Sequence, residues 1–341
     1  MIKILGVWTD AYEEFVNDIE SNITEVELII LDSLNEFEFC LRENRSAFLR
    51  LLHITELHNI PVKILTSGTE KNGNNIFQSN VEVIFWDMFW FRRTLLAWQH
   101  WANTHRNIPL GIDIGNAAVC KNFKLTYPYV CLNNKPKYHR SLILDLLAKH
   151  SILNKGAVSW LNRGMGDDFG SCYQYKYWSP CIMTLDQSAT ETFYQESMPI
   201  EFNHAFMQLV TESDDTMYCF SEKTVTPILL NKPFLVASAP NFHAWLKERG
   251  FELYDELFDY SFDCEQDIEV RFEKLVLNVK RYAEYNSIEL KKVYDSVSDK
   301  LAHNRKLAMH YAGIVPNKVQ ELKDLLMKNN THYDGSLNTF A

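Results

Sequence analysis

Short apolar runs alternate with amphipathic stretches over the first 120 residues of the chain. Residues 46–58 (SAFLRLLHITELH) carry apolar side chains at three- and four-residue spacing, the pattern of a helix with one buried face. Apolar runs separated by such helices indicate strand–helix–strand units, which build parallel sheets. We therefore expect strands at residues 2–8, 26–32, 61–66, 81–86 and 108–112.

A second alternation follows a break near residues 115–125. It predicts strands at 127–132, 157–161, 207–211 and 233–238, and helices at 138–150, 223–231 and 241–249. From residue 265 to about 329 the spacing is only helical. These patterns predict an α/β protein with an N-terminal domain at residues 1–120, a second α/β domain at 121–290 and a helical tail at 291–341.

Composition narrows the class of protein. The 341 residues include 34 Lys and Arg against 44 Asp and Glu, so the formal net charge is −10. This acidity argues against a protein that coats nucleic acid, because such proteins carry a basic surface. The seven cysteines form no Cys-x-x-Cys pair, and the sequence shows neither a signal-like leader nor 18 consecutive apolar residues. We expect a cytoplasmic protein that does not enter a membrane.

The densest polar segment is TESDDTMYCFSEK, residues 211–223, which leaves one predicted strand and enters a helix. Ser221 is a good N-cap residue, and Glu222 and Lys223 follow in the first turn. Free N–H groups, the helix dipole and the lysine together suit a phosphate. The alternative is an ordinary helix cap followed by a solvated lysine.

A second polar segment, NNKPKYHR at residues 133–140, also joins a predicted strand to a helix. Arg140 stands at the opening of that helix, just after Lys135, Lys137 and His139. The planar guanidinium of arginine is well matched to a diphosphate. A basic solvated turn is the alternative, but two such loops in one α/β domain are more informative than either alone.

Both segments resemble the C-terminal domain of the α1,3-fucosyltransferase family. The resemblance runs over about residues 127–262 and includes NNKPKYHRSLILDLL and LVTESDDTMYCFSEKTVTPILLNKPFLVAS. It implies that Arg140 and Lys223 hold the donor diphosphate, that Glu222 faces the ribose or the donor sugar, and that Glu212 matches the first residue of the family's Glu-Asn-Ser. The family's Gly-Tyr-Val run is Tyr218-Cys219-Phe220 here, which leaves the donor base and sugar open.

Residues 237–263 (ASAPNFHAWLKERGFELYDELFDYSFD) are also similar to glycosyltransferase-like proteins of large bacterial viruses. The resemblances imply two Rossmann-like domains that face a cleft, the GT-B-like arrangement, with a C-terminal helical extension. The implied activity is inverting sugar transfer from a GDP- or UDP-linked donor to a glycan or to a hydroxymethylated base of phage DNA. If the protein is viral, its compartment is the host cytoplasm.

An inverting transfer needs a carboxylate that deprotonates the acceptor hydroxyl. Asp87 and Asp10 follow predicted strands of the first domain, and Asp113 is a third candidate. Asp87 ranks first, and a turn or cap residue is the alternative for each. No obligatory metal or other cofactor is expected, because the acidic pairs Asp167-Asp168 and Asp214-Asp215 have the character of solvated residues.

Three further features bear on the function. Most of the aromatic run 85–93 is predicted to be core, while Arg92 and Arg93, with His100, His105 and Arg106, could form a basic track for DNA. Residues 163–170 (RGMGDDFG) fit no phosphate-loop spacing and are expected to be a surface loop. A non-catalytic nucleotide-binding or assembly protein is the competing function, whereas an NAD-linked oxidoreductase is disfavoured because the glycine fingerprint is missing.

Overall fold

The computed structural model describes residues 1–6, 12–33, 45–68, 79–104, 124–161, 173–185, 199–218 and 220–329. The chain forms two compact units. One unit combines Met1–Trp90 with Gly313–Ala341, and the other is Phe91–Ala312. Each unit contains a sheet of four parallel strands with helices packed on it, which confirms the predicted α/β class.

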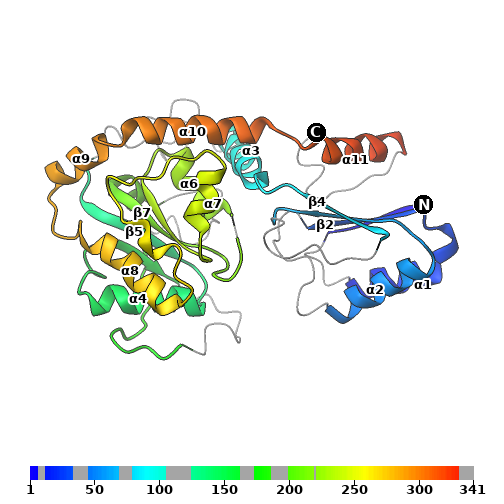
Figure 1. Cartoon of the computed structure of the whole chain (residues 1–341), viewed down its shortest axis with the longest axis horizontal. Coiled ribbons are helices and arrows are strands. Elements are labelled where there is room, and N and C mark those ends of the chain that lie inside the picture. The colour runs from blue at the N-terminus through cyan, green and yellow to red at the C-terminus, as the bar shows by residue number, and fades with distance from the viewer. Residues whose placement is uncertain are drawn as a thin grey trace. The chain divides into compact units, whose positions relative to one another are not determined.

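The sheet of the first unit has the order β1-β2-β3-β4. Its strands are β1 (Ile2–Gly6), β2 (Leu28–Ser33), β3 (Val62–Thr66) and β4 (Val81–Phe85). Its other elements are α1 (Tyr12–Ser21), a 3-10 turn η1 (Ile23–Glu25), α2 (Arg45–Leu57) and α11 (Asn317–Lys328). Right-handed crossovers that all step in one direction place α1 and α2 on the same face, and Figure 1 shows α11 on the opposite face.

Alternation along the strands builds the core of this unit. Leu5, Ile29, Leu31, Val62 and Ile64 point to one face, where α1 and α2 bury them. Glu82 of β4 lies on the other face and forms an ion pair with Lys318 of α11, with 2.5 Å between the ammonium and the carboxylate. Because helices cover both faces, the strands carry apolar residues on both sides.

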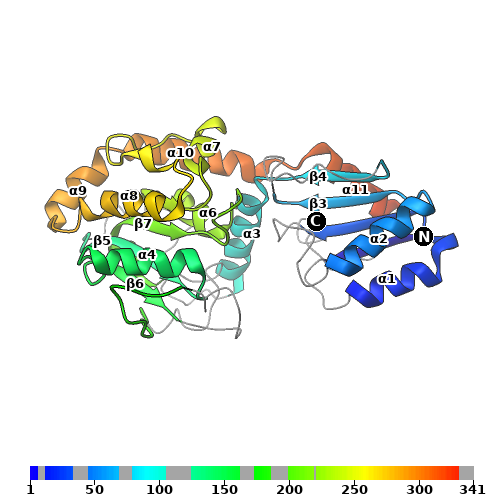
Figure 2. The ribbon, with the colours of Figure 1, turned by 60° about the horizontal axis from the view of Figure 1, so that its bottom comes forward.

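The sheet of the second unit has the order β6-β5-β7-β8. Its strands are β5 (Tyr127–Asn133), β6 (Ala157–Trp160), β7 (Ala205–Thr211) and β8 (Phe234–Ala237). The helices are α3 (Phe89–Thr104), α4 (Tyr138–Lys149), α5 (Ile200–His204), α6 (Glu222–Leu229), α7 (Phe242–Glu248), α8 (Ile268–Lys280), α9 (Ser287–Asp295) and α10 (Ser298–Gly313), with a 3-10 turn η5 (Tyr260–Phe262). Figures 1 and 2 show α4 and α8 on one side of this sheet and α6 and α10 on the other.

This strand order contains a topological switch point. From β5 the chain passes through α4 to β6, and from β7 it passes through α6 to β8 in the opposite direction. The loops that leave β5 and β7 therefore diverge to opposite faces of the sheet at its carboxyl edge, which is where α/β proteins bind ligands in a crevice. In the described part of the first unit the order β1-β2-β3-β4 never reverses, so a crevice of this kind is expected in the second unit.

Most predicted elements agree with the structure to within one or two residues at each end. The exception among the strands is residues 108–112, which lie outside the described residues. The two units differ from the three segments expected at 1–120, 121–290 and 291–341. Phe91 belongs to the second unit, where its ring stacks on Phe251 and Tyr311 with centroids 5.7 and 6.3 Å apart, whereas α11 belongs to the first unit.

The aromatic run is core, as its spacing predicts. Trp86, Met88, Phe89, Trp90 and Phe91 are each at most 5% exposed. None of the described helices combines the length and the apolar character that crossing a membrane requires.

Candidate functional site

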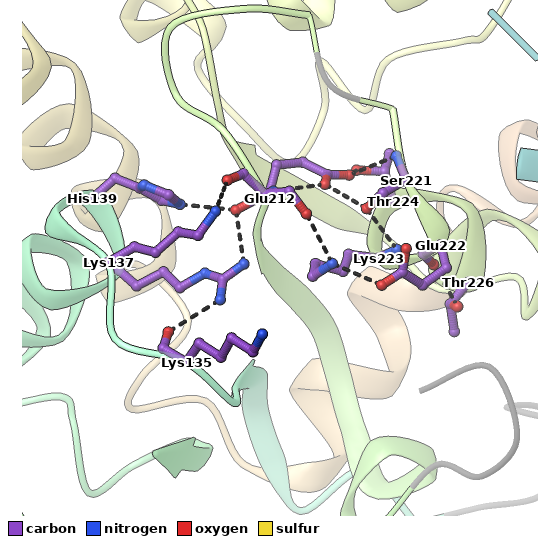
Figure 3. Close-up of polar contacts among 11 residues, drawn as sticks. Lys135, Lys137, His139, Glu212, Ser221, Glu222, Lys223, Thr224 and Thr226 are labelled. Atoms are coloured by element: carbon purple, nitrogen blue, oxygen red, sulfur yellow. Dashed lines mark hydrogen bonds and ion pairs between the residues drawn. The ribbon is translucent and has the colours of Figure 1, made fainter. Parts of the chain in front are cut away.

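The loops that leave β5 and β7 bring both polar segments together at the switch point. We call this group the switch-point cluster; its members are Lys137, His139, Arg140, Glu212, Ser213, Asp215, Ser221, Glu222 and Lys223. Figure 3 shows Lys137 and His139 approaching Glu212 from one side and Ser221, Thr224 and Lys223 approaching it from the other. Arg140, Glu212, Ser221, Glu222 and Lys223, which the sequence singled out, therefore lie in one place.

Ser221 begins α6 as an N-cap, as predicted. Its backbone is extended and its hydroxyl accepts the N–H of Lys223 at 3.3 Å. Because α6 follows β7, its first turn, with its free N–H groups, lies at the carboxyl edge of the sheet. Glu222 and Lys223 occupy that first turn, where an anionic ligand is favoured by the helix dipole.

Glu212 holds the loop after β7 against α6. Its side chain is fully buried, and its carboxylate accepts hydrogen bonds from Ser213 N at 3.0 Å and Ser221 N at 3.2 Å. The hydroxyls of Ser221 and Thr224 each donate to it at 2.5 Å. Four donors satisfy a buried carboxylate well. This geometry makes Glu212 a positioning residue; its predicted contact with a ligand stays a prediction.

The backbone carbonyls of Glu212 and Ser213 accept hydrogen bonds from basic side chains of the loop that follows β5. The carbonyl of Glu212 accepts from His139 Nε2 at 2.8 Å and from Arg140 Nη2 at 3.1 Å. Lys137 Nζ donates to the Ser213 carbonyl at 2.5 Å. Arg140 also donates to the Lys135 carbonyl at 3.1 Å. The cations are thus fixed against backbone that is more than 70 residues away in sequence, because β5 and β7 are neighbours in the sheet.

Lys223 and Glu222 form a largely buried ion pair. Lys223 Nζ lies 2.7 Å from Glu222 Oε1 and donates to Ser213 Oγ at 3.1 Å. The two side chains are 17% and 14% exposed. Burial opposes the charge of Lys223, but the carboxylates of Glu222 and then Glu212 outweigh it and raise the pKa of the lysine. Lys223 is therefore a firmly protonated cation at the start of α6.

His139 links the cluster to an acid. Its Nδ1 lies 3.1 Å from Asp215 Oδ1, and its Nε2 faces the Glu212 carbonyl. Burial lowers the pKa of His139, and the hydrogen bond with Asp215 opposes that shift. A neutral imidazole can donate a hydrogen bond from only one of its two nitrogens. Protonation of His139 makes both nitrogens donors, so that it can donate to Asp215 and to the Glu212 carbonyl at the same time.

The Glu222–Lys223 pair predicts a pH dependence of stability. Burial alone would raise the pKa of Glu222, but the charge and the hydrogen bond of Lys223 lower it below 4.5. A carboxyl group with a depressed pKa stabilises the fold above its unfolded pKa, and that contribution is lost as the pH falls through the folded value. The free energy of unfolding should therefore drop below about pH 4.5.

Urea unfolding of the wild type and of Glu222→Gln between pH 3 and pH 7 measures this contribution. The wild type should be the more stable protein at pH 7, and the difference should shrink as the pH approaches 3. A difference that stays constant over this range would show that the carboxylate of Glu222 does not stabilise the fold.

Of the three carboxylates predicted as the catalytic base, the structure describes Asp87 alone, which lies in the first unit and not in the switch-point cluster. Asp87 is half-buried in the turn that follows β4 in the first unit. Asp10 and Asp113 lie outside the described residues, as do Asp167 and Asp168. The carboxylate of Asp214 accepts from the N–H and the hydroxyl of Thr216, at 2.7 and 2.6 Å, and so forms a local turn.

Sequence reasoning missed one carboxylate of the first unit. Asp32 ends the apolar run of β2, is 3% exposed and lies in register with Gly6 of β1. The signal was the same as for Asp87, an acid that follows a buried strand.

The basic track is described only in part. Arg92 donates to the carbonyl of Ala312 at 3.3 Å, and Arg92 and Arg93 are half-buried. His105 and Arg106 lie outside the described residues, and nothing is described of the side chain of His100. In the described part of the chain, no three His, Cys, Asp or Glu side chains are arranged to hold a metal ion.

The described cluster has the features that suit an anion. It combines a helix N-terminus with three fixed cations, Lys137, Arg140 and Lys223, at the switch point of a parallel sheet. Comparison of the chain with models of protein families, with curated proteins and with solved structures finds no match.

Proposed function

We propose that the protein is an inverting glycosyltransferase that uses a GDP- or UDP-linked sugar. The observation that carries the proposal is the convergence of Lys137, Arg140 and Lys223 at the switch point of the second unit. When the sugar is transferred, the leaving group is a nucleoside diphosphate, which is the ligand that such a group of cations and a helix N-terminus suit. The resemblance of the same segments to α1,3-fucosyltransferases supports the same reaction.

The proposed chemistry is a single displacement. The acceptor oxygen forms a bond to the anomeric carbon while the bond from that carbon to the diphosphate breaks, and the acceptor proton passes to a carboxylate. Lys137, Arg140, Lys223 and the start of α6 offset the charge that develops on the leaving diphosphate. Attack from the opposite side inverts the anomeric configuration. Because side-chain cations do this work, the proposal includes no obligatory metal.

The base belongs to the first unit in this proposal. We propose that the two units face a cleft in the GT-B-like manner, with the acceptor on the first unit and the donor on the second. Asp87 remains the leading base and Asp10 and Asp113 the alternatives, to which the structure adds Asp32 as a buried carboxylate at the end of β2.

Replacing Asp87 with asparagine tests the base. Loss of a general base lowers kcat by about 10²-fold or more. Binding of the nucleoside diphosphate should change little, because Asp87 lies in the other unit. The measurement is kcat together with the Kd of GDP or UDP. Full activity in Asp87→Asn would exclude this residue, and the same experiment with Asp32→Asn would then test the next candidate.

The acceptor is a glycan or a hydroxymethylated base in DNA. The net charge of −10 favours a glycan acceptor. The feature that supports a DNA acceptor is the basic track, of which Arg92 and Arg93 are described and half-buried. A DNA acceptor requires binding that weakens steeply as salt increases. Absence of DNA binding at low salt would exclude the DNA acceptor and leave the glycan.

The competing proposal is a non-catalytic nucleotide-binding or assembly protein. It is favoured by the internal contacts of the cations, since Arg140 and Lys223 each bind acceptors of their own chain. Incubation with labelled UDP- and GDP-sugars and candidate acceptors separates the two. The proposed enzyme yields a product of inverted anomeric configuration, whereas binding of donors without any transfer, over all acceptors tried, would favour the competing function.

A further inference from the structure

The ring of His139 lies between two hydrogen-bond acceptors in a buried place. It is 2% exposed, with Nδ1 3.1 Å from the carboxylate of Asp215 and Nε2 2.8 Å from the carbonyl oxygen of Glu212. A carbonyl oxygen and an ionised carboxylate can only accept hydrogen bonds. A neutral imidazole has a single N–H, so one of its nitrogens would turn a lone pair toward an acceptor. Only the imidazolium form completes both contacts.

The proton that completes these contacts belongs on the ring, because Asp215 is ionised at neutral pH. Burial alone would raise the pKa of Asp215, but the hydrogen bond with His139 outweighs burial and lowers it below 3.8. The positive charge of Arg271 acts in the same direction. Arg271 is 3% exposed and donates from Nη2 to the backbone carbonyl of Asp215 at 3.4 Å.

Burial and a neighbouring cation oppose the proton on the ring. Burial lowers the pKa of His139 below 6.5, and the charge of Arg140 lowers it further, whereas Asp215 and the Glu212 carbonyl raise it. The charged side chains around the ring come from three parts of the second unit; they are Lys137 and Arg140 at the start of α4, Glu212 and Asp215 after β7, and Arg271 of α8.

An anion bound at Arg140 removes part of this opposition. Arg140 Nη2 and His139 Nε2 lie 3.1 and 2.8 Å from the same oxygen, the carbonyl of Glu212, so the guanidinium and the ring are neighbours. A diphosphate that offsets the charge of Arg140 weakens the repulsion between the two cations, which is strong where water is excluded. Anion binding therefore raises the pKa of His139.

We propose that His139 is a positioning residue that takes up one proton from solvent when a nucleoside diphosphate binds, and so makes donor affinity depend on pH. This inference rests on the proposed function, because the diphosphate occupies the same cations. The proton goes to the ring nitrogen that carries none, and the imidazolium then donates to Asp215 and to the Glu212 carbonyl together. Both contacts tie the loop after β7 to the start of α4, where Arg140 lies.

The sign of the pH dependence follows from the change in pKa. A group whose pKa is higher in the complex than in the free protein binds a proton on association, so the affinity rises as the pH falls from 8 toward 6. Uptake of one proton changes a binding constant by up to about tenfold per pH unit.

Calorimetric titration of GDP and UDP at pH 6, 7 and 8, without divalent metal and in two buffers of different ionisation enthalpy, measures the Kd and the protons taken up. The comparison is with Asp215→Asn, whose amide can donate to Nδ1 while Nε2 donates to the Glu212 carbonyl, so that a neutral ring completes both contacts. From pH 8 to pH 6 the wild type should gain about tenfold in affinity relative to this variant and should take up more protons. Titration of the nucleotide itself is the same for both proteins and cancels.

Asp295→Asn is the matched control, since Asp295 is 55% exposed, pairs with Lys291 and changes the net charge equally when it is replaced. It should keep the pH dependence of the wild type. A ratio of affinities between the wild type and Asp215→Asn that stays within twofold from pH 8 to pH 6, with equal proton uptake, would overturn the inference alone. If neither nucleotide binds any of these proteins at any pH, the proposed function fails as well. If Asp215→Asn does not fold, His139→Gln, which cannot take up a proton, serves for the same comparison.

Discussion

Replacing Lys223 with alanine is expected to reduce sugar transfer about a thousandfold. Removing one donor that stabilises charge in a transition state costs about 10²–10³ in rate. Lys223 is also the cation at the first turn of α6, so its loss leaves Glu222 facing the leaving diphosphate. The dissociation constant of the nucleoside diphosphate should increase in parallel, because the ammonium contacts the phosphates in the ground state too.

The measurement is kcat/KM for the nucleotide sugar together with the Kd of GDP or UDP. Lys300→Ala is the matched control, because Lys300 pairs with Glu256, is 24% exposed and lies in the same unit. Its activity should stay within twofold of the wild type. Transfer by Lys223→Ala within threefold of the wild type, in a variant that is folded at the assay temperature, contradicts the assigned site.

Replacing Glu212 with alanine is expected to destabilise the second unit by about 3–5 kcal/mol. Each buried donor left without an acceptor costs about 1–3 kcal/mol, and Glu212 serves four, of which water can satisfy some. For a unit of this size the melting temperature should fall by roughly 10 °C. Helix α6 should lose protection from hydrogen exchange first, since Glu212 holds its N-cap residue.

Glu284→Ala is the control for this prediction. Glu284 is 79% exposed and lies 3.4 Å from Lys155, so its removal should change stability by less than about 1 kcal/mol. Thermal and urea unfolding of the two variants provide the comparison. If Glu212→Ala melts within 2 °C of the wild type, the carboxylate does not hold the loop, and a direct role toward a ligand becomes the better explanation.

The elements could be predicted from the sequence because each is specified locally. Strands covered on both faces, such as β3 and β7, are short continuous apolar runs, and the polar loops between them are easily seen. The start of α6 could be predicted as well, since Ser221 is a favoured N-cap residue. That both polar loops leave the carboxyl ends of strands, where α/β proteins bind ligands, could be predicted too.

The pairing of distant segments could not be predicted in the same way. The amphipathic pattern of α11 indicates a buried face but not its partner, and the helix joins the first unit, where Lys318 binds Glu82. The strand order β6-β5-β7-β8, which brings Arg140 to the carbonyl of Glu212, depends on the whole sheet.

The role of Glu212 shows a second limit. In the sequence, Glu212 is a candidate ligand contact only because it matches the first residue of Glu-Asn-Ser in the family that the segment resembles. In the structure this carboxylate is buried and hydrogen-bonded within its own loop and α6, while the more exposed Glu222 faces Lys223. Burial depends on tertiary packing, so residue type and spacing alone could not separate the two carboxylates.

The most direct test is the thermal stability of the wild type and of Lys223→Ala with UDP-, GDP-, ADP- and CMP-sugars. A ligand at 100 times its dissociation constant stabilises the folded protein by about 2.7 kcal/mol. The account predicts that a GDP- or UDP-sugar raises the melting temperature of the wild type by several degrees and that Lys223→Ala loses this shift. No shift of the wild type with any of these donors, or an equal shift in Lys223→Ala, would contradict it.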